Sequence, residues 1–239
     1  MIDGRLDLVE HSMRADIERF QHEGWISISY GLLATTLFWA GRWVEAELAW
    51  REAIQREPPG VLQGGVQALL MTARAYRSTP GALDELQTIA SDLPSGDAEH
   101  RIGVWIQIAA LVEGFAILDR RDDVAGLYPI VRQGLEIGDI IAFGNLQLWQ
   151  MLAGMAAGAG QQWTDAEDHF ETALRQAHTL PHKIAQPEVR RWYAWMLLDR
   201  NQPGDMEKAR TLLNEAIEMY SAIGMPKHVE LTKRLLART

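Results

Sequence analysis

The sequence predicts an all-α fold: a solenoid of about five antiparallel helix pairs, with a capping helix at each end. Three observations predict it. A motif of small and apolar residues recurs at long, nearly constant intervals, which is typical of chains built from repeated helix pairs. Each copy follows a largely apolar stretch with helical spacing, and no segment alternates apolar and polar residues for long enough to form a strand. In such a stack each pair buries only its neighbours.

The motif places a small residue first, an aromatic or apolar residue four places later, and a small or apolar residue seven places later. This spacing puts all three side chains on one face of a helix, where a small residue lets a second helix approach closely. The first members are separated by steps of 36, 42, 42 and 43 residues. The five copies are Ala46, Trp50 and Ala53; Ala82, Leu86 and Ile89; Val124, Tyr128 and Val131; Ala166, Phe170 and Ala173; and Ala209, Leu213 and Ala216.

Each copy is expected on the second helix of a pair, because a mostly apolar first helix precedes it. Apolar side chains recur there at spacings of three and four, which gives each first helix an apolar face. Glycine and proline separate the helices and the pairs. The first helices contain Tyr30, Leu33, Ala34 and Leu37; Ile108, Leu111, Val112 and Phe115; Leu148, Met151, Leu152 and Met155; and Trp192, Tyr193, Met196 and Leu197.

We expect a single helical-repeat domain over the whole chain. Its parts are residues 1–24 as an N-terminal helix, 25–225 as the repeats and 226–239 as a C-terminal capping helix. The apolar stripe of the first helix ends at Phe20. The last helix carries Arg234 and Arg238 near its end, where cations favour the helix dipole. Terminal helices with a polar outer face keep a stacked array from exposing apolar surface.

Three stretches without charged residues raise the alternative of a membrane protein. They are residues 24–41, 102–112 and 140–164. The last is longer than the roughly 20 residues that a helical span needs. Its glutamines and asparagine would lack partners in hydrocarbon, however, and its flanking residues Asp139 and Asp165 are acidic. We therefore expect a soluble protein in which these stretches are helices covered by their neighbours.

Composition excludes several functional classes. The 239 residues hold 23 lysines and arginines against 32 aspartates and glutamates, a net charge of −9 that disfavours direct contact with nucleic acid. The absence of cysteine excludes disulfides, thiolate metal ligands and a cysteine nucleophile. The residues after Met1 do not resemble a secretory signal, so the cytoplasm is the expected compartment.

The sequence offers no catalytic or metal-binding pattern, so we expect neither an enzyme nor a cofactor. His178 and His182 are four residues apart, but Pro181 interrupts them, and we expect both in a surface loop between pairs. Asp165 and His169 share the spacing without the H-E-x-x-H context of a zinc site. No serine lies in a G-x-S-x-G turn, and no G-x-x-x-x-G-K-[ST] phosphate loop is present.

The first pair resembles a tetratricopeptide repeat. Its signature positions hold Tyr30, Leu33, Ala34, Leu37, Gly41, Ala46, Trp50, Ala53 and Pro58. Steps near 42 exceed that family's unit of about 34 residues. The chain is therefore similar to long-period repeats in the C-terminal parts of bacterial signal-transduction ATPases, maltose-activator-like regulators and cyclase-fused regulators. This resemblance covers roughly residues 25–225 and implies a right-handed superhelix that acts as a sensor or scaffold.

The resemblance also implies a concave groove lined by the first helices. The residues expected to contact a partner there are Ile28, Thr35, Phe38, Gln67, Met71, Arg74, Ile106, Glu113, Leu148, Met151, Met155, Arg191 and Leu198. Methionine adapts its shape easily, so the groove would suit an apolar peptide or a helix of a protein partner. The alternatives are core packing of these residues, a domain that senses a small molecule or oligosaccharide, and self-association as a homodimer. Trp39, Trp149 and Trp195 are the tryptophans expected to face a ligand.

Overall fold

The structure is a computed structural model that describes residues 3–19, 25–57, 60, 62–94 and 101–239. Within these ranges the regular structure is helical, apart from one isolated β-bridge, which confirms the all-α prediction. Phe20, at the end of the expected apolar stripe, lies outside the described residues. The helices are α1 (Leu6–Arg19), α2 (Ile26–Trp39), α3 (Trp43–Gln55), α4 (Gly65–Tyr76), α5 (Ala82–Ser91), α6 (Ile102–Ile117), α7 (Arg121–Gly126), α8 (Tyr128–Glu136), α9 (Trp149–Ala159), α10 (Trp163–Thr179), α11 (Ala185–Arg200), α12 (Asp205–Ile223) and α13 (Pro226–Leu236).

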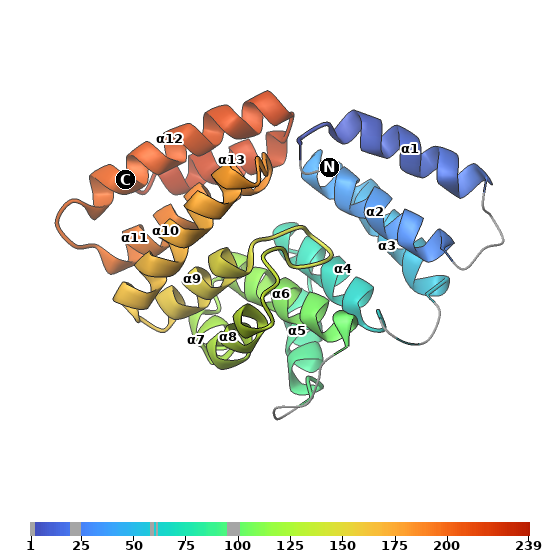
Figure 1. Cartoon of the computed structure of the whole chain (residues 1–239), viewed down its shortest axis with the longest axis horizontal. Coiled ribbons are helices and arrows are strands. Elements are labelled where there is room, and N and C mark those ends of the chain that lie inside the picture. Colours follow the sequence, from blue (N-terminus) through green and yellow to red (C-terminus); the bar gives the residue numbers. More distant parts are fainter. Residues whose placement is uncertain (1–2, 20–24, 58–59, 61, 95–100) are drawn as a thin grey trace.

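The helices follow one another around an arc (Figure 1). Helices α1 to α3 form one arm, α4 to α9 the middle, and α10 to α13 the other arm, so that both ends of the chain lie on the same side. Consecutive helices pack on each other as pairs, α2 with α3, α4 with α5, α9 with α10 and α11 with α12. The helices that open successive pairs, α4, α6, α9 and α11, also pack on one another. These opening helices form the inner layer of the arc.

The recurring motif residues lie where the sequence places them, on α3, α5, α7 with α8, α10 and α12. All are buried except Ile89, which is half-buried. Their small members let the paired helix approach closely, and Gly154 on α9 does the same: a Cβ there would lie 2.9 Å from the ring of Phe170 on α10. The motif thus marks the contact face within each pair.

The second helix of the third pair is broken into α7 and α8. Pro129 lies in the first turn of α8 and has no backbone N–H to continue the hydrogen-bond ladder of α7. Val124 and Val131, on either side of the break, are nevertheless fully buried. The faint copy of the motif therefore keeps its packing role although the helix is interrupted.

The sequence predicts a buried helix over the uncharged stretch 140–164, but the structure divides this stretch between a loop and two helices. Residues 137–148, here named the inner loop, precede α9 and are held by an antiparallel bridge between Ile141 and Leu148. The loop crosses the inner layer: Gly144, with a φ of +108°, lies against Ile106 of α6, and the Thr35 hydroxyl of α2 donates a hydrogen bond to its carbonyl at 3.5 Å. Ala142 and Leu148 of the loop are buried in the core, whereas Ile137, Ile140 and Phe143 are exposed.

The expectation that each pair contacts only its neighbours is wrong at the ends of the chain. The ring of His228 on α13 lies 5.5 Å from Phe38 and 5.0 Å from Trp39, both on α2, measured between ring centroids. A Cβ on Gly41, in the turn after α2, would lie 3.0 Å from the side chain of Lys227. Through these contacts α13 closes the array into a ring.

No helix in the described ranges is long and apolar enough to cross a membrane. The longest uncharged stretch divides between the inner loop, the 11-residue α9 and the start of α10. The glycines of α9 serve instead as close contacts within the fold, since a Cβ on Gly158 would lie 2.7 Å from Met196.

Candidate functional site

A cluster of buried polar side chains lies where helices of the middle meet those of the α10–α13 arm. This central cluster consists of Tyr76 on α4, Glu113 on α6, Glu188 and Arg191 on α11, Tyr220 on α12 and His228 on α13. All six side chains are buried. Burying charges is unfavourable unless they are paired and hydrogen-bonded. The pairing within the cluster therefore decides whether it is stable.

Arg191 is the hub of the central cluster. Its Nη2 donates to Glu188 at 2.7 Å and to the Tyr76 hydroxyl at 2.9 Å, and its Nε donates to the Tyr220 hydroxyl at 3.2 Å. Each tyrosine hydroxyl in turn donates a short hydrogen bond to a carboxylate, Tyr76 to Glu113 and Tyr220 to Glu188. One cation thus connects two carboxylates on two helices.

Glu113 is the more weakly compensated of the two carboxylates. Burial, with the nearby charge of Glu188, raises the pKa of Glu113 to about 7. Asn145 and Gln147 of the inner loop donate to its second oxygen. For Glu188 burial acts in the same direction, but the adjoining Arg191 outweighs it and holds the pKa of Glu188 below its usual range. The cluster is therefore close to neutral when Glu113 carries a proton.

His228 completes the cluster as a neutral ring. Burial lowers the pKa of His228 to about 4, although the carboxylate of Glu188, 3.9 Å away, acts in the opposite direction. Neither ring nitrogen has a hydrogen-bond partner among the described residues. The ring instead packs against aromatic side chains of α2, α4 and α12. His228 thus joins the two ends of the array by packing.

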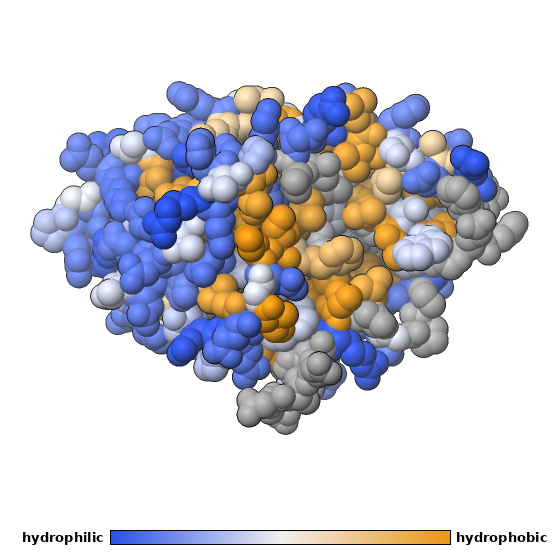
Figure 2. All heavy atoms as spheres, viewed as in Figure 1, coloured by the Kyte–Doolittle hydropathy of each residue, from blue (hydrophilic) through white to orange (hydrophobic). Residues whose placement is uncertain are grey.

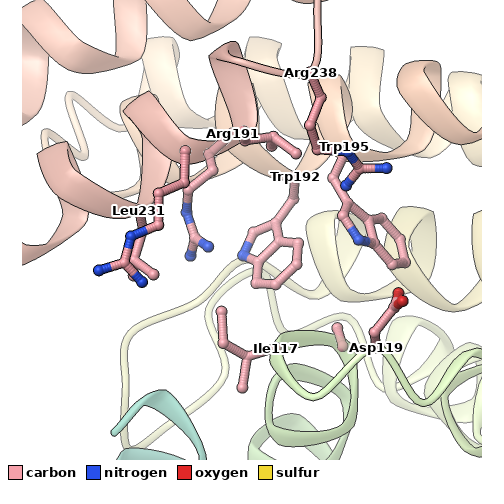
Figure 3. Close-up of a pocket in the computed structure, with 10 residues that line it drawn as sticks. Ile117, Asp119, Arg191, Trp192, Trp195, Leu231 and Arg238 are labelled. Atoms are coloured by element: carbon pink, nitrogen blue, oxygen red, sulfur yellow. The ribbon is translucent and has the colours of Figure 1, made fainter. Parts of the chain in front are cut away.

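A pocket of about 320 Å³ opens beside the central cluster, between α6, α11 and α13 (Figure 3). We name it the Arg–Trp pocket. Trp192 and Trp195 project into it from α11, and Ile117 and Asp119 face them from the end of α6 (Figure 3). The lining residues are Ala116, Ile117, Asp119, Arg191, Trp192, Trp195, Leu231, Arg234, Leu235 and Arg238.

The charges around the Arg–Trp pocket are unequally paired. Asp119 accepts a hydrogen bond from Arg121 at 2.9 Å, and Arg191 is held by the central cluster. Arg234 and Arg238 are exposed and form no salt bridge with any described residue. The excess charge of the pocket is therefore positive.

Trp192 contributes an unused hydrogen-bond donor to the same pocket. Its side chain is almost fully buried, with 2% exposed, and its Nε1 has no partner in the described part of the chain. Figure 3 shows this nitrogen on the side of the ring that faces Arg191 and Leu231. Buried N–H groups are rarely left without an acceptor in folded proteins. The pocket thus combines two unpaired cations with an unpaired donor.

Most of the residues predicted to line a partner groove are in the core. Those buried are Thr35, Phe38, Met71, Ile106, Glu113, Leu148, Met151, Met155 and Arg191. The half-buried ones are Ile28, Gln67, Arg74 and Leu198. The predicted wall of methionines is not an accessible surface, because Met71, Met151 and Met155 are buried. Of the whole set, Glu113 and Arg191 belong to the central cluster, and only Arg191 reaches the Arg–Trp pocket.

Three predicted groove residues do come together elsewhere. Gln67, Met71 and Arg74 line a depression of about 280 Å³ between α3 and α4. Arg74 is already paired there with Glu85 of α5, at 2.7 Å. The depression therefore lacks the free charge that marks the Arg–Trp pocket.

The tryptophan predictions have mixed outcomes. Trp195 lines the Arg–Trp pocket, as expected of a ligand-facing residue. Trp39 and Trp149 are buried instead, Trp39 against His228 and Trp149 edge-on to Trp105. The sequence does not predict that Trp192, Arg234 and Arg238 line a ligand site. Leu231 is three and four residues before Arg234 and Leu235, and Arg238 is four and three residues after them, a spacing that the sequence alone could reveal.

The histidines considered for metal binding have structural roles or none. His182 is fully buried, not in a surface loop as expected: its Nε2 lies 2.9 Å from the Leu146 carbonyl and its Nδ1 accepts from the Ala185 N–H. His178 is exposed. In the described ranges no group of three or more histidine, aspartate and glutamate side chains could hold a metal ion.

Comparisons of the chain with protein-family models, with curated proteins and with solved structures gave no match. The geometry of the central cluster and of the Arg–Trp pocket is therefore the basis for any functional argument.

Proposed function

We propose that this chain is a non-enzymatic helical-repeat module that senses a small molecule, and that the ligand binds in the Arg–Trp pocket. The observation that carries the proposal is the pocket itself, about 320 Å³ in volume, with aromatic walls and convergent polar groups. This combination is typical of small-molecule sites. We prefer a small-molecule sensor to the peptide-binding groove that the sequence predicts, because most of the predicted groove residues are buried and the inner loop lies against Thr35.

The architecture that we propose for this module is a right-handed, tetratricopeptide-like solenoid of about five pairs whose ends have been joined. Its support is the burial of the recurring motif on the second helix of every pair. The sequence resemblance to long-period repeats favours a place in a bacterial signalling or transcription-regulatory system. Closure by α13 distinguishes this chain from an open stack.

The position of the pocket gives a bound ligand a way to change the molecule. Arg191 lines the pocket and is also the hub that connects α4, α11 and α12. Helix α13 supplies one wall and, through His228, the contact with α2. A ligand that touches α6, α11 and α13 together would stabilise the closed ring over any more open state, in proportion to its preference for the closed form.

Protection of an introduced cysteine tests the proposal. The chain has no cysteine, so Ile117→Cys places a unique thiol in the pocket, and Ser221→Cys on the exposed side of α12 is the matched control. The probes are 1-naphthoate, 1-naphthamide, 1-naphthylmethylammonium and maltotriose, which differ in charge and polarity. We expect at least one to raise the melting temperature and to slow alkylation by N-ethylmaleimide at position 117 but not at 221. Stabilisation without protection at 117, or no effect of any probe, would contradict the proposal.

A second candidate function is docking of a protein partner on the inner loop. Three large apolar side chains of this loop are exposed, Phe143 at 57%, Ile137 at 56% and Ile140 at 41%. Figure 2 shows apolar surface gathered at the middle of the face on which Figure 1 draws the inner loop. The partner that we propose is a second copy of the chain, in line with the homodimer considered from the sequence.

Sedimentation analysis separates this candidate from the first. We expect the wild-type chain to dimerise and Phe143→Ser to be monomeric at the same concentration, with an unchanged helical circular-dichroism spectrum. An exposed apolar residue far from the loop, Leu48→Ser on α3, is the control and should leave the dimer intact. A wild-type monomer at all concentrations would exclude the second copy.

A further inference from the structure

We infer that the Arg–Trp pocket selects a small organic anion with a flat apolar body, held by Arg234, Arg238 and the Nε1–H of Trp192. This inference rests on the proposed function and names the chemical class of its ligand. It depends on three properties of the pocket: an unused donor, an unbalanced positive charge, and aromatic walls.

The unused donor is the indole N–H of Trp192. A buried N–H that has lost water and found no acceptor destabilises the fold, whereas the same N–H becomes favourable when a ligand oxygen accepts from it. The guanidinium of Arg191 lies 4.2 Å from the centroid of the Trp192 ring, but it has only donors and cannot accept from this N–H. No described residue therefore satisfies the indole N–H beside the pocket.

The charge of the pocket favours an acceptor that is negative. Arg234 lies on α13 and Arg238 in the turn that follows it; both line the pocket, where their like charges repel each other. The carboxylate of Asp119 does not neutralise them, because it pairs with Arg121. An anion between the two arginines would remove the repulsion and would form charge-assisted hydrogen bonds, which are stronger than neutral ones.

The walls of the pocket favour a flat apolar body. The rings of Trp192 and Trp195 meet edge to face, with centroids 5.6 Å apart, and Ile117 adds an aliphatic surface opposite them. Aromatic ligands pack on such surfaces by stacking or by edge contacts. A volume of about 320 Å³ is at the lower end of the range for ligand pockets, roughly 300–1,000 Å³. One or two fused rings with a single anionic group match these dimensions.

Calorimetric titration of the full chain with three isosteric probes tests the anion preference. The probes are 1-naphthoate, the neutral 1-naphthamide and the cationic 1-naphthylmethylammonium. We expect naphthoate to bind about tenfold or more tightly than the amide, as the loss of a charge-assisted contact implies, and the ammonium compound not to bind. Equal affinity for naphthoate and naphthamide would overturn the inference. Binding of the neutral or cationic probe alone would overturn it while leaving the proposed sensor function in place.

Variants locate the anion within the pocket. Arg234→Gln with Arg238→Gln removes two positive charges from the pocket, and Lys233→Gln with Arg175→Gln removes two from exposed positions outside it. We expect the first pair to weaken naphthoate binding at least about tenfold and the second to change it less than about twofold. Equal effects of the two pairs would show that only the net charge matters and would contradict the assigned site.

Trp192→Phe tests the donor separately, because it keeps an aromatic ring and removes the N–H. We expect naphthoate affinity to fall by about fivefold to tenfold, while naphthamide affinity falls less, since hydrogen bonds to charged acceptors are the stronger ones. A melting curve of the free variant establishes that it folds. An unchanged preference for naphthoate over naphthamide in the folded variant would exclude the indole N–H as a ligand donor.

Discussion

The central cluster and the Arg–Trp pocket are adjacent, share Arg191 and are built from similar residue types, yet they differ in how completely they are paired. In the cluster, Arg191 serves two tyrosines and Glu188, and Tyr76 passes a hydrogen bond on to Glu113. In the pocket, two arginines lack carboxylate partners among the described residues and an indole N–H lacks an acceptor.

This difference distinguishes polar groups that stabilise the fold from polar groups that we propose bind a ligand. A satisfied buried network fixes one arrangement of the helices around it, and removing one member leaves the others uncompensated. Unpaired polar groups around a cavity contribute little to the fold and become favourable when a ligand pairs them. We therefore expect changes in the cluster to alter stability and changes in the pocket to alter ligand binding.

The largest effect should come from Arg191→Met, which leaves the carboxylate of Glu188 buried without its cation. We expect a loss of about 3–5 kcal/mol in the free energy of unfolding, measured by urea denaturation. The exposed pocket residue provides the comparison: Arg234→Met should change the same quantity by less than about 0.5 kcal/mol. Similar losses for the two variants would remove the distinction between the regions.

Glu113→Gln should reveal the raised pKa of Glu113. Because the folded pKa of about 7 lies above the ordinary 4.5, the stability contributed by the protonated carboxyl is complete below pH 4.5 and is lost as the pH rises to 7. Glutamine mimics the protonated form. Relative to wild type, the variant should therefore gain stability between pH 4.5 and 7, by up to about 3 kcal/mol. A difference that does not vary over this interval would contradict the shift.

His228→Phe should show the opposite pH dependence. The folded pKa of about 4 lies below the ordinary 6.5, so the neutral ring contributes stability above pH 6.5 that is lost as the pH falls towards 4. Phenylalanine keeps the aromatic packing and cannot be protonated. Relative to wild type, urea denaturation of the variant should show a gain of about 1–3 kcal/mol on acidification from pH 6.5 to 4. A constant difference would indicate that the ring is not buried in solution.

The smallest effects come from removing one donor at each place. Tyr220→Phe deletes a hydroxyl that bridges Arg191 and Glu188, and we expect it to destabilise the fold by about 1–2 kcal/mol in urea denaturation. Trp192→Phe removes an N–H that has no partner, so no hydrogen bond is lost with it. We expect the free energy of unfolding to change by less than about 1 kcal/mol. If Trp192→Phe is clearly the more damaging of the two, the indole N–H has a structural partner in solution.

The fold could be predicted largely from local pattern, and the predictions that were wrong have a common cause. The motif at Ala46, Ala166 and Ala209 marks contacts between helices that are adjacent in the sequence, and these follow from helical spacing. The closure of the ring through His228 and Phe38 joins residues 190 positions apart, for which spacing gives no information. The sequence does not predict the inner loop, because an uncharged stretch is compatible both with a buried helix and with a loop that packs on neighbouring helices.

The site was predictable only in fragments. Glu113 and Arg191 were selected as inward-facing residues, which they are, but their pairing through two tyrosines depends on four different helices. The sequence explains Arg234 and Arg238 by the helix dipole, because it cannot show that they line a pocket together with residues at the end of α6. Two components of the pocket are expected from the sequence to face a partner or ligand, Arg191 and Trp195.

The most direct test of the account is a two-dimensional ¹⁵N–¹H spectrum of the tryptophan indoles. The chain has nine tryptophans, and Trp192→Phe assigns the signal of interest by its disappearance. On addition of 1-naphthoate to the wild-type chain we predict a downfield shift of the Trp192 Nε1–H proton, because it gains an anionic acceptor, with no comparable shift on addition of 1-naphthamide. A Trp192 signal that does not move when naphthoate binds would contradict the assignment of this pocket as the ligand site.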